Sequence, residues 1–320
     1  MASSSAHYKL LVSTCLLDWY KQHARDLPWR QTTDPYHIWI SEIMLQQTQV
    51  KTVLPRYAAW FEAFPDIQTL AQAHLDDVLK QWEGLGYYRR ARFIHEAAKQ
   101  IMRNFAGEFP QTFENILGLK GIGQSTAGAI ASFCFGAYTP VLDGNVKRVL
   151  SSWENKVLSD KALWNLAQAW IDKTEQPDVW NQAMMELGAT LCSAKKRDCA
   201  ACPMRQHCLS AFQTPLKSKS SIKIQDVHWL VQIFQHDEHG IWLEQRPDSG
   251  IWAGLWTPPI QVLEARPKQQ PDYIHQLTHR RIHLYIENKQ ELPQGKGQWF
   301  TSWEGLAVPT GIHRLFEQYI

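Results

Sequence analysis

The chain has 320 residues, of which 44% are hydrophobic and 20% charged, as in an ordinary globular protein long enough for two domains. No apolar stretch is long enough to cross a bilayer, and residues 1–6 lack the basic start and apolar run of a secretory signal. We therefore expect a cytoplasmic protein that does not associate with membranes.

The formal net charge of +2 is distributed unevenly along the chain. Residues 1–225 contain 25 Lys and Arg against 20 Asp and Glu, whereas residues 226–320 contain 8 against 11. This modest basic excess in the first part allows a polyanionic partner such as nucleic acid, but it does not identify one.

The first two thirds of the chain have helical periodicity, with apolar residues three and four positions apart. Proline and glycine divide this stretch into segments. The expected helices lie at about 8–20, 38–48, 50–63, 75–82, 90–105, 112–117, 125–135, 145–152, 161–172 and 179–191.

The pattern changes after a polar, lysine- and serine-rich stretch at 213–225, which we interpret as a linker. Alternating apolar residues then predict strands at 228–234, 240–245 and 282–286. The sequence thus predicts a mainly α region over 1–212 and a smaller α+β domain over 226–320.

Four cysteines, Cys192, Cys199, Cys202 and Cys208, are spaced C-x6-C-x2-C-x5-C. Zinc knuckles usually combine two C-x2-C pairs, and here only Cys199 and Cys202 form such a pair. Four thiolates in one short loop favour a [4Fe–4S] cluster, with zinc as the alternative. A disulfide framework does not suit a cytoplasmic protein of this size.

A glycine turn, Gly121-Ile122-Gly123, lies between two expected helices. Glycines at the start of a helix expose backbone N–H groups at the positive end of the helix dipole, and these groups can bind a DNA phosphate. A Gly-x-Gly turn can also serve only to join two helices tightly. The longer string L-x-G-I-G-x-x-T-A is the more specific helix–hairpin–helix signature.

Two carboxylates are candidates for acid and charge chemistry. Glu42 lies among apolar residues, where desolvation raises a carboxyl pKa and suits it to donate a proton; alternatively, it only stabilises its helix. Asp143 precedes the helix expected from residue 145, so it can act as an N-cap, as a fixed anion, or as both. Cleavage of a glycosidic bond uses such a pair.

The hairpin, Asp143 in V-L-D-G-N-V and the cysteine loop together resemble the endonuclease III, or helix–hairpin–helix, superfamily of base-excision DNA glycosylases. The match is closest to its adenine DNA glycosylase (MutY) branch. The strings that carry it are L-P-W-R at 27–30, S-E-I-M-L-Q-Q-T-Q-V at 41–50, G-L-G-Y-Y at 84–88 and M-E-L-G-A at 185–189.

This resemblance covers nearly all of 8–212 and, more loosely, 226–320. It implies a helix–hairpin–helix glycosylase fold with an iron–sulfur loop, followed by a Nudix-like domain. The six-helix part would span about 28–134, and the iron–sulfur part about 1–27 and 135–212.

The resemblance also implies a monomeric enzyme with a [4Fe–4S] cluster that removes adenine mispaired with 8-oxoguanine or guanine in double-stranded DNA. Glu42 would be the catalytic acid, and Asp143 would stabilise the cationic sugar. The adenine pocket would be lined by Arg25, Trp29, Arg30 and Glu186. Residues near the opposite base would be Gln47, Thr48, Leu85 and Tyr87. For Trp29, Leu85 and Tyr87 the alternative is ordinary core packing.

Ser125 occupies the position at which lyase members of the superfamily carry a nucleophilic lysine. Without an amine no Schiff base can form there, so we expect a monofunctional glycosylase. Gly121, Gly123 and Ser125 would contact DNA phosphate.

The C-terminal domain resembles a Nudix domain around Gln245–Pro259 but lacks the clustered carboxylates that a Nudix hydrolase uses to hold metal ions. It therefore looks like a recognition module. The family's Phe-Ser-His loop, which meets 8-oxoguanine, corresponds to Leu277-Thr278-His279. Thr278 keeps a hydroxyl and His279 is retained, whereas Leu277 replaces the aromatic residue.

Two other functions remain as alternatives. One is a glycosylase/lyase acting on oxidised pyrimidines, against which Ser125 argues. The other is an iron–sulfur protein that binds DNA lesions without cleaving them, against which the pairing of Glu42 with Asp143 argues.

Overall fold

The computed structural model describes residues 2–213, 224–291 and 293–319, and it describes side chains from residue 12 onward. The chain divides into two compact units, residues 1–47 with 97–219 and residues 48–96 with 220–320. Most of the linker expected at 213–225 lies outside the described residues. None of the helices in the described ranges is long and apolar enough to cross a membrane.

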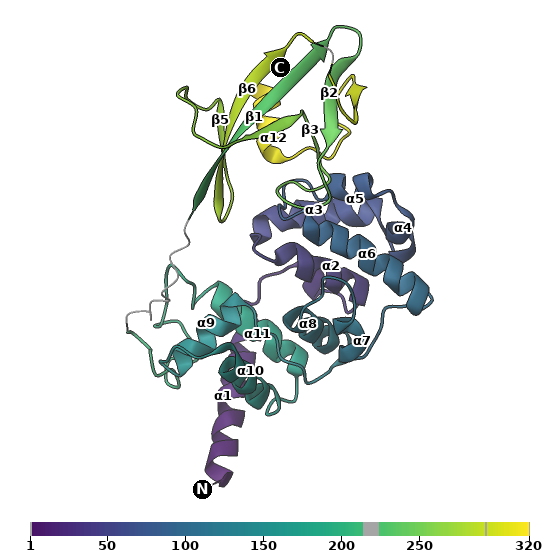
Figure 1. Ribbon diagram of the computed structural model, residues 1–320. Coiled ribbons are helices and arrows are strands. Elements are labelled where there is room, and N and C mark those ends of the chain that lie inside the picture. The colour runs from purple at the N-terminus through teal and green to yellow at the C-terminus, as the bar shows by residue number, and fades with distance from the viewer. Residues whose placement is uncertain (1, 214–223, 292, 320) are drawn as a thin grey trace. The chain divides into compact units, whose positions relative to one another are not determined.

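The first unit is helical (Figure 1). Its helices are α1 (Ala2–His23), α2 (Pro35–Leu45), α7 (Phe113–Leu117), α8 (Gln124–Phe135), α9 (Gly144–Trp153), α10 (Asp160–Ile171) and α11 (Pro177–Ala189), together with a 3-10 turn at Pro28–Arg30 and the end of α6 (Arg89–Asn104). Side-chain N-caps set several of the starts, because an acceptor satisfies a free N–H of the first turn. Thr112 caps α7, and Ser159 caps α10.

A hydrophobic core joins α1, α9, α10 and α11. Within it three tryptophan rings, Trp153, Trp170 and Trp180, lie with centroids 5.5 to 6.4 Å apart. Cys192 and Cys208 pack against this core. The cysteine loop therefore rests on the same helices that carry Asp143 and Glu186.

The second unit combines helices with a sheet. Its helices are α3 (Val50–Ala63), α4 (Ile67–Gln72), α5 (Leu75–Gln81), the first half of α6, and α12 (Thr310–Tyr319); its strands are β1 (Gln225–His236), β2 (Gly240–Gln245), β3 (Trp256–Thr257), β4 (Ile260–Leu263), β5 (Tyr273–Gln276), β6 (Arg280–Lys289) and β7 (Gly297–Phe300).

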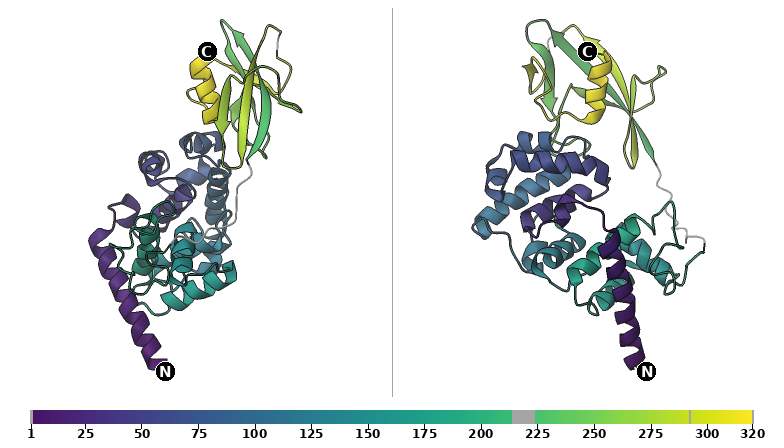
Figure 2. Two further views of the ribbon diagram at one scale, coloured as in Figure 1. Left: turned by 90° about the vertical axis from the view of Figure 1, so that its left-hand side faces the viewer. Right: turned by 180° about the vertical axis from the view of Figure 1, so that it is seen from behind.

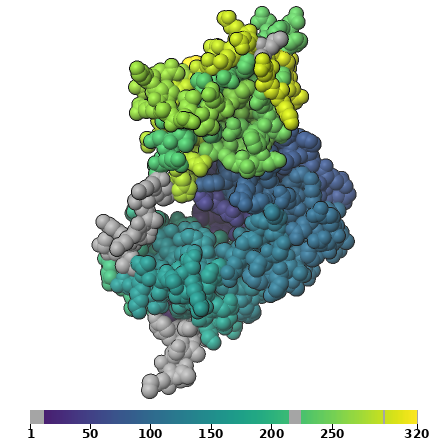
Figure 3. Space-filling view, viewed as in Figure 1, coloured from purple at the N-terminus to yellow at the C-terminus, as the bar shows by residue number. Residues whose placement is uncertain are grey.

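The seven-stranded sheet is built around β1, which pairs in parallel with β6 from Gln225↔Arg280 to Phe234↔Lys289. On its other side β1 pairs antiparallel with β4 and β2. Helix α12 lies along one face of the sheet (Figure 2). In the space-filling view the described residues of this region are coloured green to yellow (Figure 3). The strands β5 and β6 flank the loop that contains Thr278.

The ten expected helices are confirmed, with shifts at their ends. The expected 38–48 is α2, which runs from Pro35 to Leu45. It starts early because Asp34 caps it and Pro35 suits the first turn, and it stops before Gln47, whose φ of +56° is not helical. The sequence patterns did not identify α4, α12 or the short strands β3, β4, β5 and β7.

Candidate active site and cysteine loop

Glu42 lies on α2, on a helix whose other side chains are mostly buried. Burial, and secondly the nearby Asp143 carboxylate, raise the pKa of Glu42 to about 8, while Arg30 opposes the shift. A carboxyl group with this pKa holds its proton at neutral pH, so Glu42 can donate it.

Asp143 is the N-cap of α9. Its carboxylate accepts hydrogen bonds from the backbone N–H of Val146 at 2.8 Å and from Nδ2 of Asn145 at 3.0 Å. Burial raises the pKa of Asp143, and these hydrogen bonds, together with the charge of Arg148, oppose the rise. Of the two coupled carboxyls, Glu42 is therefore the one that carries the proton.

Arg148 links the Asp143 cap to the rest of the unit. Its guanidinium donates to Oδ1 of Asn145 at 2.8 Å, to the carbonyl of Gly188 at 2.5 Å and to the carbonyl of Cys192 at 2.7 Å. Sequence reasoning did not select Asn145 or Arg148. The feature that could have identified them is their spacing of three residues, which places both side chains on one face of α9 just after Asp143.

Glu186 on α11 is fully buried and pairs with two arginines. Arg25 donates to it through Nε at 2.6 Å, and Arg30 donates through a terminal nitrogen at 2.7 Å. Burial opposes the charge of Glu186, but the hydrogen bonds from the two arginines outweigh it, so the pKa of Glu186 is lowered. Three of the four residues expected around adenine thus form one ionic cluster.

Trp29, the fourth of these residues, lies in the turn Pro28–Arg30 and is buried. Its neighbour Arg30 lies over the ring of Tyr20, 5.3 Å from the centroid. The hydroxyl of Tyr20 in turn donates to Gln182 on α11. The turn is therefore held against α1 and α11 by cation–π and polar contacts.

The glycine hairpin precedes α8. Gly121 has a φ of +79°, which glycine adopts readily, and Gly123 is the N-cap without a side-chain hydrogen bond to the first turn. Both glycines are exposed. The hydroxyl of Ser125 accepts a hydrogen bond from the backbone N–H of Leu142 at 3.0 Å.

In the second unit, a loop before α6 has three residues with positive φ within four positions. Gly84 and Gly86 have φ values of +84° and +69°, and Tyr87 has +49°. Leu85 is buried, whereas Tyr87 is 45% exposed. Arg90 braces the loop by donating to the carbonyls of Leu85 at 2.9 Å and Gly86 at 3.1 Å. The Tyr87 side chain is therefore exposed, and its positive φ strains the backbone at this position.

The hydroxyls of Tyr87 and Thr278 are hydrogen-bonded to each other. Thr278 and His279 are exposed in the turn between β5 and β6, and Leu277 closes that turn with a backbone hydrogen bond to Arg280. The hydroxyl of Thr48 also accepts from Arg90 at 3.2 Å. Four residues expected near the opposite base, Thr48, Leu85, Tyr87 and Thr278, are thus connected through this loop.

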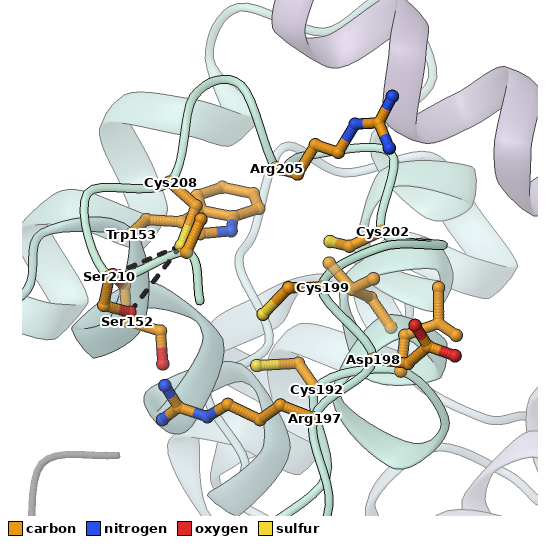
Figure 4. Close-up of a pocket in the computed structure, with 13 residues that line it drawn as sticks. Ser152, Trp153, Cys192, Arg197, Asp198, Cys199, Cys202, Arg205, Cys208 and Ser210 are labelled. Atoms are coloured by element: carbon orange, nitrogen blue, oxygen red, sulfur yellow. Dashed lines mark hydrogen bonds between the residues drawn. The ribbon is translucent and has the colours of Figure 1, made fainter. Parts of the chain in front are cut away.

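The four cysteines Cys192, Cys199, Cys202 and Cys208 line one pocket (Figure 4). The thiol of Cys208 is hydrogen-bonded to the carbonyl of Ser152 at 3.5 Å and to the hydroxyl of Ser210 at 3.7 Å. Arg197 and Arg205 line the same pocket. Within the described ranges, no group of three or more His, Cys, Asp or Glu is close enough together to hold a single metal ion. Four thiols that line one pocket are a donor set that suits an iron–sulfur cluster or a zinc ion.

Comparison of this chain with known proteins shows the family to which it belongs. Residues 40–174 match the HhH-GPD superfamily of base excision DNA repair proteins. An adenine DNA glycosylase of Buchnera aphidicola subsp. Schizaphis graminum is 35% identical, covering 95% of this chain and 97% of the relative. The chain belongs to the adenine DNA glycosylase family. A second relative, from the Acyrthosiphon pisum subspecies, is 39% identical over 78% of this chain and 74% of the relative.

Among solved structures, a thermostable thymine-DNA glycosylase aligns with a TM-score of 0.59 and 27% identity. The alignment covers 65% of this chain and 98% of the other. These comparisons confirm the expected family and the helical fold with a helix–hairpin–helix motif, and the sheet domain agrees with the expected α+β region.

Proposed function

We propose that the chain hydrolyses the N-glycosidic bond of adenine mispaired with 8-oxoguanine or guanine in double-stranded DNA, as a monofunctional base-excision glycosylase. The observation that carries this proposal is the pair formed by Glu42 and Asp143. One carboxyl has a pKa of about 8, and the other is a hydrogen-bonded helix cap. This is the division between acid and fixed anion that glycosidic cleavage needs.

In the proposed reaction, adenine is first flipped out of the duplex, at a cost of a few kcal/mol that is smaller for a mispair. Glu42 protonates N7 of the base, and the electron pair of the C1′–N9 bond leaves with adenine. Asp143 stabilises the positive charge that develops on the sugar. The Glu42 carboxylate then takes a proton from the water that adds to C1′, which restores the acid.

The remaining site residues have supporting roles in this proposal. Arg25, Trp29, Arg30 and Glu186 line the adenine pocket, and Gln47, Thr48, Leu85, Tyr87, Thr278 and His279 lie near the opposite base. Gly121, Gly123 and Ser125 contact DNA phosphate. The ionic cluster at Glu186 supports its assignment, because a buried, fully paired carboxylate gives a rigid polar wall.

Strand cleavage after alkali tests this function on duplexes containing A:8-oxoguanine, A:G, A:T or thymine glycol. We expect products from the first two duplexes and none from the others, and no covalent enzyme–DNA product on borohydride trapping. Cleavage of only the thymine glycol duplex, or a trapped adduct, would favour the glycosylase/lyase alternative. Binding without cleavage of any duplex would favour the lesion-binding alternative.

We also propose that Cys192, Cys199, Cys202 and Cys208 hold a [4Fe–4S] cluster, which would cross-link the loop to the core of α9 and α11. The support is the shared pocket and the contact of the loop with that core. The C-terminal domain is proposed as a Nudix-like recognition module, and the protein as a monomer of the cytoplasm.

Cys202→Ser tests the cluster. Serine is a poor ligand for iron, so iron and sulfide bound per chain should fall to less than half. The unfolding temperature should fall by several degrees, because losing about 1–2 kcal/mol shifts a protein of this size by roughly 2–8 °C. Cys134→Ser is the matched control on α8 and should keep its iron. Equal iron in both variants, or zinc in its place, would contradict the cluster assignment.

The double variant Thr278→Ala, His279→Ala tests the reading of the opposite base. Losing two polar contacts should reduce the preference for 8-oxoguanine over guanine opposite adenine by roughly 10-fold or more, since one hydrogen bond is worth about 1 kcal/mol. The measurement is the ratio of single-turnover rates on the two duplexes. An unchanged ratio would remove this loop from the recognition site.

A further inference from the structure

The segment 136–143 connects α8 to α9 and delivers Asp143 to the site without regular secondary structure. Two of its backbone N–H groups are bound by side chains. Val141 N–H donates to Oδ1 of Asn181 at 3.0 Å, and Leu142 N–H donates to the hydroxyl of Ser125 at 3.0 Å. Val141 and Leu142 are the two residues immediately before Asp143. Their hydrogen bonds therefore fix the backbone position from which the Asp143 side chain extends.

Asn181 makes further bonds on the same segment. Its Nδ2 donates to the carbonyl of Thr139 and to the hydroxyl of Ser132 on α8, both at 3.0 Å. Asn181 is 3% exposed, and Ser132 is completely buried. One amide side chain therefore uses its oxygen and both N–H donors to join α11, α8 and the connecting segment in a dry environment, where such bonds are strong and costly to break.

Close packing leaves the segment little room to move. A Cβ at Gly128 of α8 would lie 2.4 Å from the carbonyl oxygen of Pro140 in the segment, and a Cβ at Gly188 of α11 would lie 2.6 Å from Cβ of Asn145, two residues after Asp143. The segment is thus in close contact with α8, and the first turn of α9 is in close contact with α11. A shift of Asn181 is transmitted to Asp143 rather than absorbed by the chain.

We propose that Asn181 is a positioning residue for the glycosidic cleavage, which holds Asp143 at its working distance from Glu42. This inference rests on the proposed function and deepens it. Asn181 does not touch the reacting atoms; it acts through Val141 and the Asp143 carboxylate. The helix that carries it also carries Glu186, so one rigid element sets both the fixed anion and the polar wall of the adenine pocket.

Displacing Asp143 has two measurable consequences. The developing positive charge on the sugar loses part of its stabilisation, so the cleavage step slows. In addition, Asp143 is the second cause of the raised pKa of Glu42, after burial. Moving the aspartate away should therefore lower the pKa of Glu42 and shift the alkaline limb of the pH–rate profile to lower pH. A purely structural role for Asn181 would not produce this shift.

The experiment compares Asn181→Leu, which keeps the side-chain branching at Cγ but removes all three hydrogen bonds, with Asn181→Asp, which keeps the acceptor for Val141. The full-length holoprotein is used with an A:8-oxoguanine duplex below the unfolding temperature of each variant. For Asn181→Leu we expect a single-turnover rate lower by about 10²-fold, as for a misplacement of about 1 Å. Binding to an uncleavable duplex should change less than about 3-fold, and Asn181→Asp should lose less rate than Asn181→Leu.

Met184→Ala is the matched control, because Met184 is buried in the hydrophobic core on the same helix and its side chain has no N–H to donate to the connecting segment. It should lose stability while keeping the rate and the pH profile of the wild type. Folded Asn181→Leu protein with the wild-type rate and pH profile would overturn the inference, as would an equal shift in Met184→Ala. Failure of the wild type to release adenine would instead count against the proposed function itself.

Discussion

Glu42→Gln should abolish most of the adenine release, with a single-turnover rate lower by roughly 10²–10⁴-fold, the usual contribution of a general acid. Glutamine has nearly the same shape as a protonated glutamic acid but cannot give up a proton. Binding to an uncleavable A:8-oxoguanine duplex should therefore remain close to that of the wild type. The measurement is the rate on a saturating amount of enzyme, compared with Glu62→Gln, which changes an exposed glutamate on α3.

The pH dependence follows from the same group. Glu42 must be protonated to act as the acid, and its pKa is about 8. The wild-type cleavage rate should therefore fall as the pH rises from neutral through about 8. A profile that rises through this region would contradict the assignment of Glu42 as the acid.

The Glu42→Gln variant should lose activity but gain stability. Burial favours the neutral form of Glu42 in the folded state, so folding loses stability as the pH rises from the ordinary carboxyl pKa toward 8. Glutamine removes this cost, so Glu42→Gln should be more stable than the wild type at neutral pH, by on the order of 1–3 kcal/mol. Equal stability of the two proteins in urea at neutral pH would show that Glu42 is not held in a dry place.

The parts of the fold that could be predicted are those with local causes. The spacing of apolar residues predicted the helices of the first unit. The spacing of the two hairpin glycines and of the four cysteines predicted the loops in which they lie. The short strands were missed because two to four residues are too few to show alternation, as at Trp256–Thr257. The sequence predicted the end of α2 too late, because no local sequence feature indicates the positive φ of Gln47.

The residues of the candidate site could be predicted from the sequence, but the hydrogen bonds and ion pairs between them could not. Glu186 was selected, but its pairing with Arg25 joins positions 161 residues apart and leaves no pattern in the sequence. Asn181 was not selected, because a polar residue followed by Gln182 looks like a surface position until its bonds to Val141, Ser132 and Thr139 are known. The grouping of residues 48–96 with the sheet also rests on distant contacts, such as that between Arg92 and Asp248.

Asp143→Asn should separate the two roles of the aspartate. Asparagine caps a helix about as well as aspartate, so the unfolding temperature should stay within a few degrees of the wild type. The negative charge is lost, however, and the cleavage rate should fall by roughly 10²–10³-fold, as when one electrostatic stabiliser of a transition state is removed. The alkaline limb set by Glu42 should also move below its wild-type position, because the like charge that helps to raise the pKa of Glu42 is gone.

Asp66→Asn is the matched control, since Asp66 caps α4 through the N–H of Thr69 at 2.6 Å and belongs to the other unit. It should change neither the rate nor the pH profile. Asp143→Ala removes the cap as well as the charge and should cost a further 0.5–2 kcal/mol or so of stability. If Asp143→Asn cleaved as fast as the wild type, the carboxylate would be a cap alone, and the positive charge on the sugar would have to be stabilised by another group.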